Sequence, residues 1–210
     1  MFYDLTKRLL DIIGSILGII LFLPFLMFGI IWVKLMSPEG PVFADIPNRS
    51  GKGGKDFRMY KFRSMIPGAQ QWLEDHPEWK TKYIENNYKL DPDPRWIKGA
   101  KFIRKTSIDE MPQVFNILKG EMSLVGPRAY FPFELEEQRE RYPEAGKYID
   151  EVLKAKPGLT GPWQVGGRYA IGFVDRVKMD EEYAKKRSIV YDLLIILRTP
   201  FAVLLQKGSY

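Results

Sequence analysis

Cysteine is absent from the 210-residue sequence, and histidine occurs once, as His76. Without cysteine the chain cannot form disulfides, thiolate nucleophiles or cysteine-based zinc sites. A single histidine rules out histidine clusters and argues against a Ser-His catalytic triad. His76 stands beside a proline among charged residues in "EDHPEW", a composition typical of an exposed surface position. Any chemistry must therefore depend on carboxylates, cations, hydroxyls or amides.

Charge is absent from the stretch 12–33, "IIGSILGIILFLPFLMFGIIWV". As a straight helix, these 22 residues would span about 33 Å, enough for a hydrocarbon core of about 30 Å. The run is too long for a signal peptide and lacks a small-residue cleavage site. Pro24 falls just past the middle of the run, where a proline removes a backbone hydrogen bond and kinks a helix. Ser15 carries the only side-chain hydroxyl there and could satisfy a freed backbone group.

Both flanks of this run are basic, with Lys7 and Arg8 before it and Lys34 after it. Because positive charge favours the cytoplasmic side of a membrane, basic residues at both ends favour a re-entrant helix hairpin. The sequence therefore predicts a monotopic membrane protein whose residues 1–33 form a hairpin broken at Pro24. A kinked full span and a buried core helix are the alternatives.

The charges in residues 1–33 cancel, so the net charge of +6 belongs to residues 34–210. A basic globular part indicates an anionic partner, such as a phosphorylated substrate, a phospholipid surface or nucleic acid. The apolar run favours a partner at a membrane. No helix-turn-helix, RNP-type or zinc-finger motif is present, so we expect no nucleic acid among the partners.

The globular part is expected to be α/β, helix-rich with a small sheet, because 45% of the sequence is hydrophobic and helical patterns dominate. The Gly-rich stretch 48–56 predicts a hairpin loop. Alternation in "FRMYKFRSM" (57–65) predicts a strand with Lys61 and Arg63 on one face, either solvated or directed at a phosphate. Helical patterns follow at 68–90 (interrupted at Pro77), 133–155 (broken near Pro143) and 173–187, with a Gly/Pro loop at 156–168.

Two adjacent acids, Asp109 and Glu110, stand in "KFIRKTSIDEMPQ" (101–113). Either Ser107 or Asp109 can serve as the N-cap of a helix, and both arrangements place the acids at a helix N-terminus. Such a position favours anions, and Arg104 could bind a phosphate there in bidentate fashion. Two carboxylates could also share a divalent metal with phosphate oxygens, and an Asp can attack phosphorus. Spacing alone leaves a simple helix cap as the alternative.

The chain resembles the bacterial sugar transferases, the monotopic phosphoglycosyl transferases. The matching stretches cover nearly the whole chain together with the proline-broken N-terminus: "MYKFRSM" (59–65), "DPRW" (93–96), "FIRKTSIDEMPQVFNILKGEMSLVGPR" (102–128), "PGLTGPWQVGGR" (157–168) and the closing "YDLLIILRTPFAVLLQKGSY". Within the family, the ending and "WQVGGR" look most like undecaprenyl-phosphate galactose and glucose phosphotransferases.

The resemblance implies a magnesium-dependent, ping-pong enzyme at the cytoplasmic face of a bacterial inner membrane. It would transfer a sugar-1-phosphate from a UDP-sugar to polyprenyl (undecaprenyl) phosphate, releasing UMP, as the first membrane step of polysaccharide synthesis. Asp109 matches the nucleophile that forms a phosphosugar intermediate, and Glu110 its partner; both would bind Mg²⁺. Membrane lipids and a second copy of the chain are further candidate partners. The residues implied in substrate or phosphate binding are Lys61, Arg63, Arg104, Arg128, Gln164 and Arg168.

Two departures from the family pattern, Ala129 after "GPR" and Pro162 in "LTGPWQV", leave the sugar open. Two other activities also remain open from the sequence. A membrane phosphohydrolase would use water instead of a lipid phosphate, and a membrane-anchored scaffold would use the acids only as a helix cap.

Overall fold

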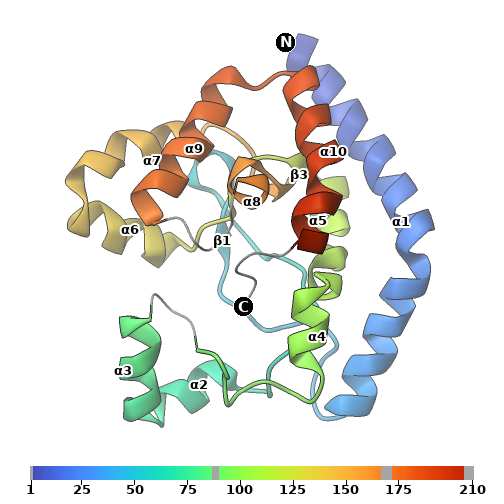
Figure 1. Ribbon diagram of the computed structural model, residues 1–210, viewed down its shortest axis with the longest axis vertical. Helices are drawn as coiled ribbons and strands as arrows, with labels where there is room; N and C mark the ends of the chain where they lie inside the picture. The colour runs from blue at the N-terminus through green and yellow to red at the C-terminus, as the bar shows by residue number, and fades with distance from the viewer. Residues whose placement is uncertain (1, 87–89, 167–171, 206–210) are drawn as a thin grey trace. The chain divides into compact units, whose positions relative to one another are not determined.

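A computed structural model describes residues 2–86, 90–166 and 172–205 and is rich in helix (Figure 1). The chain divides into two compact units, which are described separately. The larger unit comprises residues 1–22, 46–60 and 112–209, and the smaller unit residues 23–45 and 61–111. Two small sheets accompany the helices, so the expected helix-rich class with little sheet is confirmed for the described residues.

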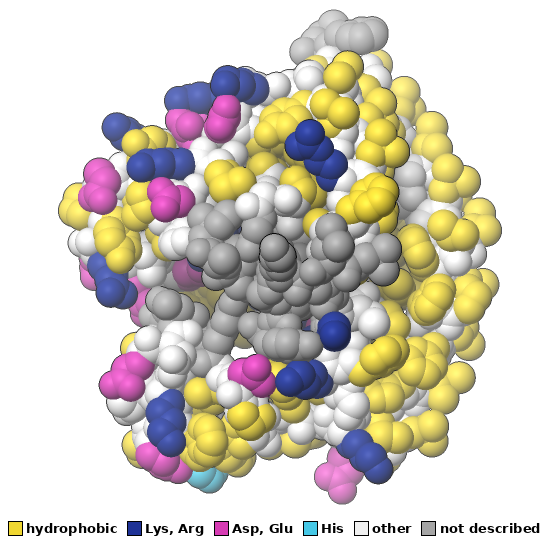
Figure 2. All heavy atoms as spheres, viewed as in Figure 1, with side chains coloured by type: hydrophobic (Ala, Val, Ile, Leu, Met, Phe, Trp, Pro, Cys, Tyr) yellow, Lys and Arg dark blue, Asp and Glu magenta, His cyan; other side chains and the backbone are white. Residues whose placement is uncertain are grey.

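Helix α1 (Phe2–Met36) takes part in both units and has Pro24 in its interior. It is long and apolar enough to cross a membrane, and hydrophobic side chains gather along it (Figure 2). Many of them are exposed, including Leu17, Leu21 and Leu23. The predicted break at Pro24 is not seen, because helix continues on both sides of the proline. A re-entrant hairpin therefore stays a prediction. Ser15 is fully buried, and its hydroxyl has no hydrogen-bond partner among the described residues.

The smaller unit contains the end of α1 and three short helices, α2 (Ala69–Glu74), α3 (Pro77–Glu85) and α4 (Ala100–Lys105). The predicted interruption of the helical stretch at Pro77 is confirmed, since α3 begins there. Phe62 joins a buried core with residues from α1, from α4 and from the segments before and after α4: Leu26, Trp32, Val33, Ile97, Ala100, Ile103 and Ile108. A Cβ at Gly29 would lie 2.3 Å from the Phe62 ring, so the missing side chain is what admits the ring.

The predicted strand over 57–65 is largely wrong. Only β1 (Arg49–Ser50) and β2 (Asp56–Phe57) pair, as the ends of the expected Gly-rich hairpin. Beyond them, Phe62 and Met65 make single bridges to Phe43 and Trp96. Side chains in this segment alternate without a continuous β-strand. Phe62 enters the core, whereas Lys61 pairs with Asp109 and Arg63 bonds to Ser37.

The larger unit has a two-stranded parallel sheet of β3 (Ser123–Val125) and β4 (Gly158–Thr160), with Ser123 opposite Gly158 and Val125 opposite Thr160. The β1–β2 pair also belongs to this unit. Besides the first part of α1, the unit contains the helices η1 (Lys52–Gly54), α5 (Val114–Lys119), α6 (Pro132–Arg141), η3 (Pro143–Ala145), α7 (Gly146–Val152), α8 (Pro162–Val165), α9 (Phe173–Lys186) and α10 (Ile189–Leu205). The predicted break near Pro143 and the predicted helix at 173–187 are confirmed. The expected loop at 156–168 instead contains β4 and α8.

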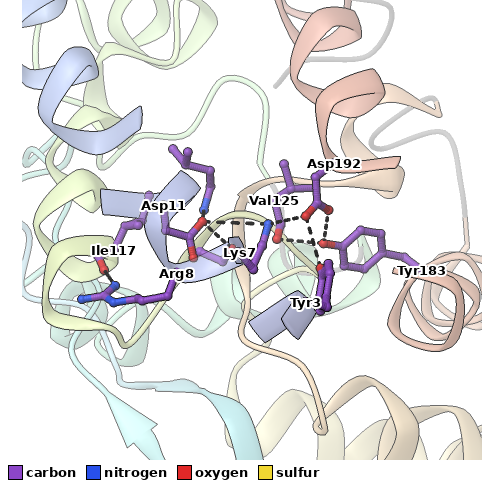
Figure 3. A network of polar contacts seen from close by, with 10 residues as sticks. Tyr3, Lys7, Arg8, Asp11, Ile117, Val125, Tyr183 and Asp192 are labelled. Carbon is purple, nitrogen blue, oxygen red and sulfur yellow. Dashed lines mark hydrogen bonds and ion pairs between the residues drawn. The ribbon is translucent and has the colours of Figure 1, made fainter. Parts of the chain in front are cut away.

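The first turns of α1 are fastened to the larger unit by a polar network (Figure 3). Lys7 forms an ion pair with Asp192 of α10 at 2.9 Å, and Asp11 accepts hydrogen bonds from the Ser123 hydroxyl and the Leu124 N–H. Arg8 donates to the carbonyls of Ile117 and Leu118 at the end of α5, at 2.6 Å each. The Ile117 carbonyl also accepts from the Gly120 N–H, so Arg8 adds a second donor there and supplies one to Leu118 at the helix end.

Candidate functional site

The two acids lie in a short 3₁₀ helix, η2 (Ile108–Gln113), between α4 and α5. Both acids lie in the first turn of this helix, which begins directly after Ser107, so their predicted place at a helix N-terminus is confirmed; the helix is 3₁₀, and the expected α-helix start is not seen. Ser107 has a left-handed backbone (φ 56°), which ends the turn after α4. Pro112, inside η2, lacks the N–H that a regular α-helix would use at this position. A six-residue 3₁₀ helix aligns few peptide dipoles, so its N-terminus favours an anion less than the expected α-helix start would.

Asp109 is held by two neighbouring residues of the segment after β2. The Lys61 ammonium lies 2.8 Å from Asp109 Oδ2 and 3.4 Å from Glu110 Oε1. The Phe62 N–H donates to the Asp109 carbonyl at 2.8 Å, so backbone and side chain are both fixed. Asp109 is almost completely buried (1% exposed), whereas a third of the Glu110 side chain is exposed. The acids are thus unequal: one is fixed in the interior and the other is accessible.

Burial raises the pKa of the Asp109 carboxyl, and the neighbouring charge of Glu110 raises it further. Lys61 and Arg104 act in the opposite direction and favour the ionised form. Burial alone would lower the pKa of Lys61, but the attraction of Asp109 and Glu110 outweighs it and the pKa is raised. The result is an ammonium that keeps its proton beside a desolvated, unusually basic carboxylate.

Arg104 is in the last turn of α4, half-buried, with its guanidinium 5.7 Å from the centre of the Trp96 ring. Its Nη1 donates a long hydrogen bond, 3.5 Å, to the Ser64 hydroxyl. Its charge acts on Asp109 and on Lys61. The smaller unit therefore brings together four of the predicted residues: Lys61, Arg104, Asp109 and Glu110.

Arg63 is occupied differently. It is buried, and its three guanidinium nitrogens donate to the Pro41 carbonyl, the Ser37 hydroxyl and the Ser37 carbonyl. These bonds close the turn that follows α1. The structure thus gives Arg63 a structural role, and contact with a phosphate stays a prediction.

Arg128 and Gln164 belong to the larger unit. The Arg128 guanidinium lies 5.1 Å from the centre of the Trp163 ring, and its backbone N–H donates to Asp180 at 3.0 Å. Gln164 is in α8 and buried, at 6% exposed. Arg168 lies outside the described residues.

Asp180 was missed by reasoning from the sequence. It is fully buried, and its Oδ2 also accepts a hydrogen bond from the Tyr130 hydroxyl at 2.9 Å. The available signal was its spacing, because Asp180 falls on the apolar face of α9 with Val177 and Tyr183. A carboxylate on the buried face of a helix indicates a specific partner.

Metal binding was predicted at Asp109 and Glu110. Within residues 2–86, 90–166 and 172–205, no three or more His, Asp or Glu side chains cluster as a self-sufficient metal site. Two adjacent carboxylates nevertheless fit Mg²⁺, which commonly takes one or two protein carboxylates plus substrate phosphates and water. Glu110 is the more accessible of the two, since 33% of its side chain is exposed against 2% for Asp109.

A buried acid held by a lysine and acted on by the charge of an arginine, beside a second, partly exposed acid, is an arrangement suited to phosphoryl transfer. The chain belongs to the bacterial sugar transferase family, whose sequence model matches residues 2–206. It is similar to undecaprenyl-phosphate galactose phosphotransferase of Salmonella typhimurium, with 40% identity over 97% of this chain and 41% of the relative. It is also similar to exopolysaccharide production protein ExoY of Sinorhizobium fredii, with 35% identity over 98% of this chain and 88% of the relative.

A third relative is UDP-glucose:undecaprenyl-phosphate glucose-1-phosphate transferase of Caulobacter vibrioides, with 34% identity over 99% of this chain and 73% of the relative. The chain spans about two fifths of the length of several curated relatives that it matches. The shared family supports a sugar phosphotransferase.

Proposed function

We propose that this chain transfers a sugar-1-phosphate from a UDP-sugar to polyprenyl phosphate, giving polyprenyl-diphospho-sugar and UMP. The names of its relatives support the substrate classes. The observation that carries the mechanism is the buried Asp109 carboxylate held 2.8 Å from the Lys61 ammonium. Such a carboxylate is poorly hydrated, fixed in orientation and raised in basicity, as a nucleophile toward phosphorus requires.

In the first step, an Asp109 oxygen attacks the sugar-bearing phosphorus. The bond from that phosphorus to the bridging oxygen breaks, and UMP leaves with the electron pair. Lys61 and Arg104 stabilise the negative charge that develops on the phosphoryl and leaving oxygens. The product of this step is an acyl phosphate between Asp109 and the sugar phosphate.

In the second step, a phosphate oxygen of the lipid acceptor attacks the same phosphorus. The acyl-phosphate bond breaks, and its electrons return to Asp109 as the carboxylate, which pairs with Lys61 again. Glu110, more exposed than Asp109, lies beside the entering group and can receive or release a proton there.

Mg²⁺ bound by Glu110 and Asp109 together with the donor diphosphate would neutralise phosphate charge and make UMP a better leaving group. Lys61 and Arg104 would act on the same diphosphate oxygens as the metal. Both the protein cations and the metal would therefore stabilise the charge on the leaving UMP.

The anchor proposed for this enzyme is α1, with its exposed apolar side chains in the bilayer and the remainder of the chain at the cytoplasmic face of a bacterial inner membrane. Because the acceptor phosphate also lies at headgroup depth, this attachment would keep acceptor and nucleophile at high local concentration. A re-entrant course of α1 is part of this proposal.

Intact-protein mass spectrometry tests the covalent step. The purified chain is mixed with Mg²⁺ and a panel of UDP-sugars, with the lipid acceptor withheld. We expect an added sugar-phosphate mass and release of UMP, both absent in Asp109→Asn. Asp75→Asn removes an exposed carboxylate from the same unit and should behave like the unmodified chain.

Addition of polyprenyl phosphate should then remove the adduct and yield the lipid product. Release of sugar phosphate into water at the same rate without the lipid would instead identify a phosphohydrolase. Full transfer activity in Asp109→Asn would refute the proposed nucleophile.

A further inference from the structure

A second polar site lies in the larger unit, where the first turns of α1 meet the segments around Ser123, Lys156 and Arg187. A cavity of about 290 Å³ opens there. Five cations line it, whereas the lining includes only two acids, Asp4 and Asp11. The cations are Lys7, Arg8, Lys52, Lys156 and Arg187. Such an excess of positive charge is costly unless an anion compensates it.

Two of these cations are committed to protein groups, Lys7 to Asp192 and Arg8 to carbonyls at the end of α5. Lys52 and Lys156 form no ion pair with any residue that the structure describes. Arg187 makes one long hydrogen bond, 3.5 Å, to the Lys154 carbonyl. Three cations of the cavity therefore retain donors for a ligand.

The cations also repel one another. Partial burial lowers the pKa of Lys156, and the charges of Arg8 and Lys52 lower it further. Asp11 acts in the opposite direction without cancelling them. Lys156 and Arg8 approach the same residue, since a Cβ built on Gly120 would lie 3.5 Å from Lys156 Nζ and 3.7 Å from an Arg8 nitrogen. An anion among these groups would replace repulsion with attraction and restore the ammonium form of Lys156.

The position on α1 identifies the source of the anion. Tyr3, Lys7 and Asp11 line the cavity. By contrast, Leu5, Leu9 and Ile13 of the same turns are 52–65% exposed. One face of this helix segment is therefore polar and the other apolar, as in a helix at the boundary between headgroups and acyl chains. The two sets of side chains lie on opposite sides of this helix segment, so a lipid with its headgroup in the cavity would extend its acyl chains around the first turns of α1 to reach the apolar face.

We propose that this cavity binds the phosphate group of an anionic membrane phospholipid. The phosphodiester would accept hydrogen bonds from Lys52, Lys156 and Arg187, while the acyl chains would lie along the exposed apolar face of α1. Basic pockets beside membrane helices on the cytoplasmic side are known to suit such headgroups. The proposal concerns residues outside the Asp109 site and does not depend on the transfer reaction.

The test is native mass spectrometry of the full chain in neutral detergent, titrated with dioctanoyl phosphatidylglycerol. Lys52→Ala/Lys156→Ala should weaken binding by at least about tenfold, since each basic residue contributes roughly fivefold near such a headgroup. Lys55→Ala/Lys154→Ala removes the same charge from exposed neighbours outside the cavity and should change binding by less than about twofold.

Thermal unfolding without lipid shows that both variants are folded. The cavity variant should be at least as stable as the unmodified chain, since its substitutions remove repulsion.

Equal weakening in both double variants would overturn the proposal, because it would indicate general surface attraction. Inorganic phosphate that competes at the same concentration as the lipid would overturn the assignment to a phospholipid and indicate a soluble phosphate. No donor or acceptor substrate is present in this experiment. A failed transfer assay would therefore leave its result intact, and a failed binding assay would leave the proposed transferase intact.

Discussion

Replacement of Asp180 by Asn should make the protein more stable, and the gain should depend on pH. Asp180 is fully buried in the larger unit, and burial raises its pKa to about 7, although hydrogen bonds from the Arg128 N–H and the Tyr130 hydroxyl act in the opposite direction. Its Oδ1 is buried without a hydrogen-bond partner among the described residues. An Asn at this position would retain one accepting oxygen and carry no charge, so it imitates the protonated Asp.

The magnitude follows from the two protonation equilibria. An unfolded Asp titrates near 3.9, so between about pH 4 and pH 7 the native state holds a proton that the unfolded state has released. The contribution of Asp180 to stability is thus fully present below about pH 4 and is lost as pH rises through about 7. Each pH unit corresponds to about 1.4 kcal/mol, which gives about 4 kcal/mol over the whole interval. Between pH 5 and pH 8 the expected loss is about 3 kcal/mol.

Thermal unfolding in neutral detergent at pH 5 and pH 8 measures this difference. The gap in Tm between Asp180→Asn and the unmodified chain should widen by roughly 6 to 11 °C from the lower to the higher pH. Asp175→Asn, an exposed substitution on the same helix, should show no such widening. A gap of the same size at both pH values would refute the argument that Asp180 is an ionised, desolvated group.

Two further predictions concern other parts of the chain. Lys61→Met removes the cation that favours ionised Asp109, so the acid limb of the pH profile for UMP release should move to higher pH; an unchanged limb would contradict the assigned pairing. Gly126→Ala places a Cβ 2.3 Å from the Lys156 carbonyl and 2.7 Å from the Gly158 nitrogen, both backbone atoms, and should lower the free energy of unfolding by about 1–3 kcal/mol in denaturant titrations. Gly18→Ala, with open space around it, is the control and should not destabilise the protein.

Elements with strong local signals could be predicted from the sequence. Helix α9 begins after Gly172, carries Asp175 in its first turn and Lys185 and Lys186 in its last, and was expected almost at its observed bounds. The hairpin around 48–56 was likewise indicated by its glycines. These features depend on neighbours in the chain, so no knowledge of distant contacts was needed.

The site depends on contacts between distant segments, and there prediction from local pattern failed. Alternation in 57–65 suggested that Lys61 and Arg63 act alike, yet Lys61 pairs with Asp109 whereas Arg63 closes the turn after α1. The positive φ of Ser107 changed the setting of Asp109 and Glu110 from an α-helix start to a 3₁₀ turn. The resemblance to a family supplied Asp109 as nucleophile, while the position of Asp180 became meaningful only once its burial was known.

If Asp109 is the nucleophile, the clamp formed by the contacts of Lys61 and Phe62 with Asp109 and Glu110 also determines when a growing chain can become reactive. Lys61 and Glu110 are 49 residues apart in sequence, and closing a loop of that length costs about 3 kcal/mol in chain entropy before any contact repays it. Phe62 binds the Asp109 backbone and also lies in the buried core of its unit, so the clamp forms together with that core. An incompletely synthesised or partly unfolded chain would hold Asp109 as an ordinary hydrated carboxylate. Under the proposed mechanism, unfinished protein would therefore not consume the sugar donor, because the proposed nucleophile forms in the same step that completes the core.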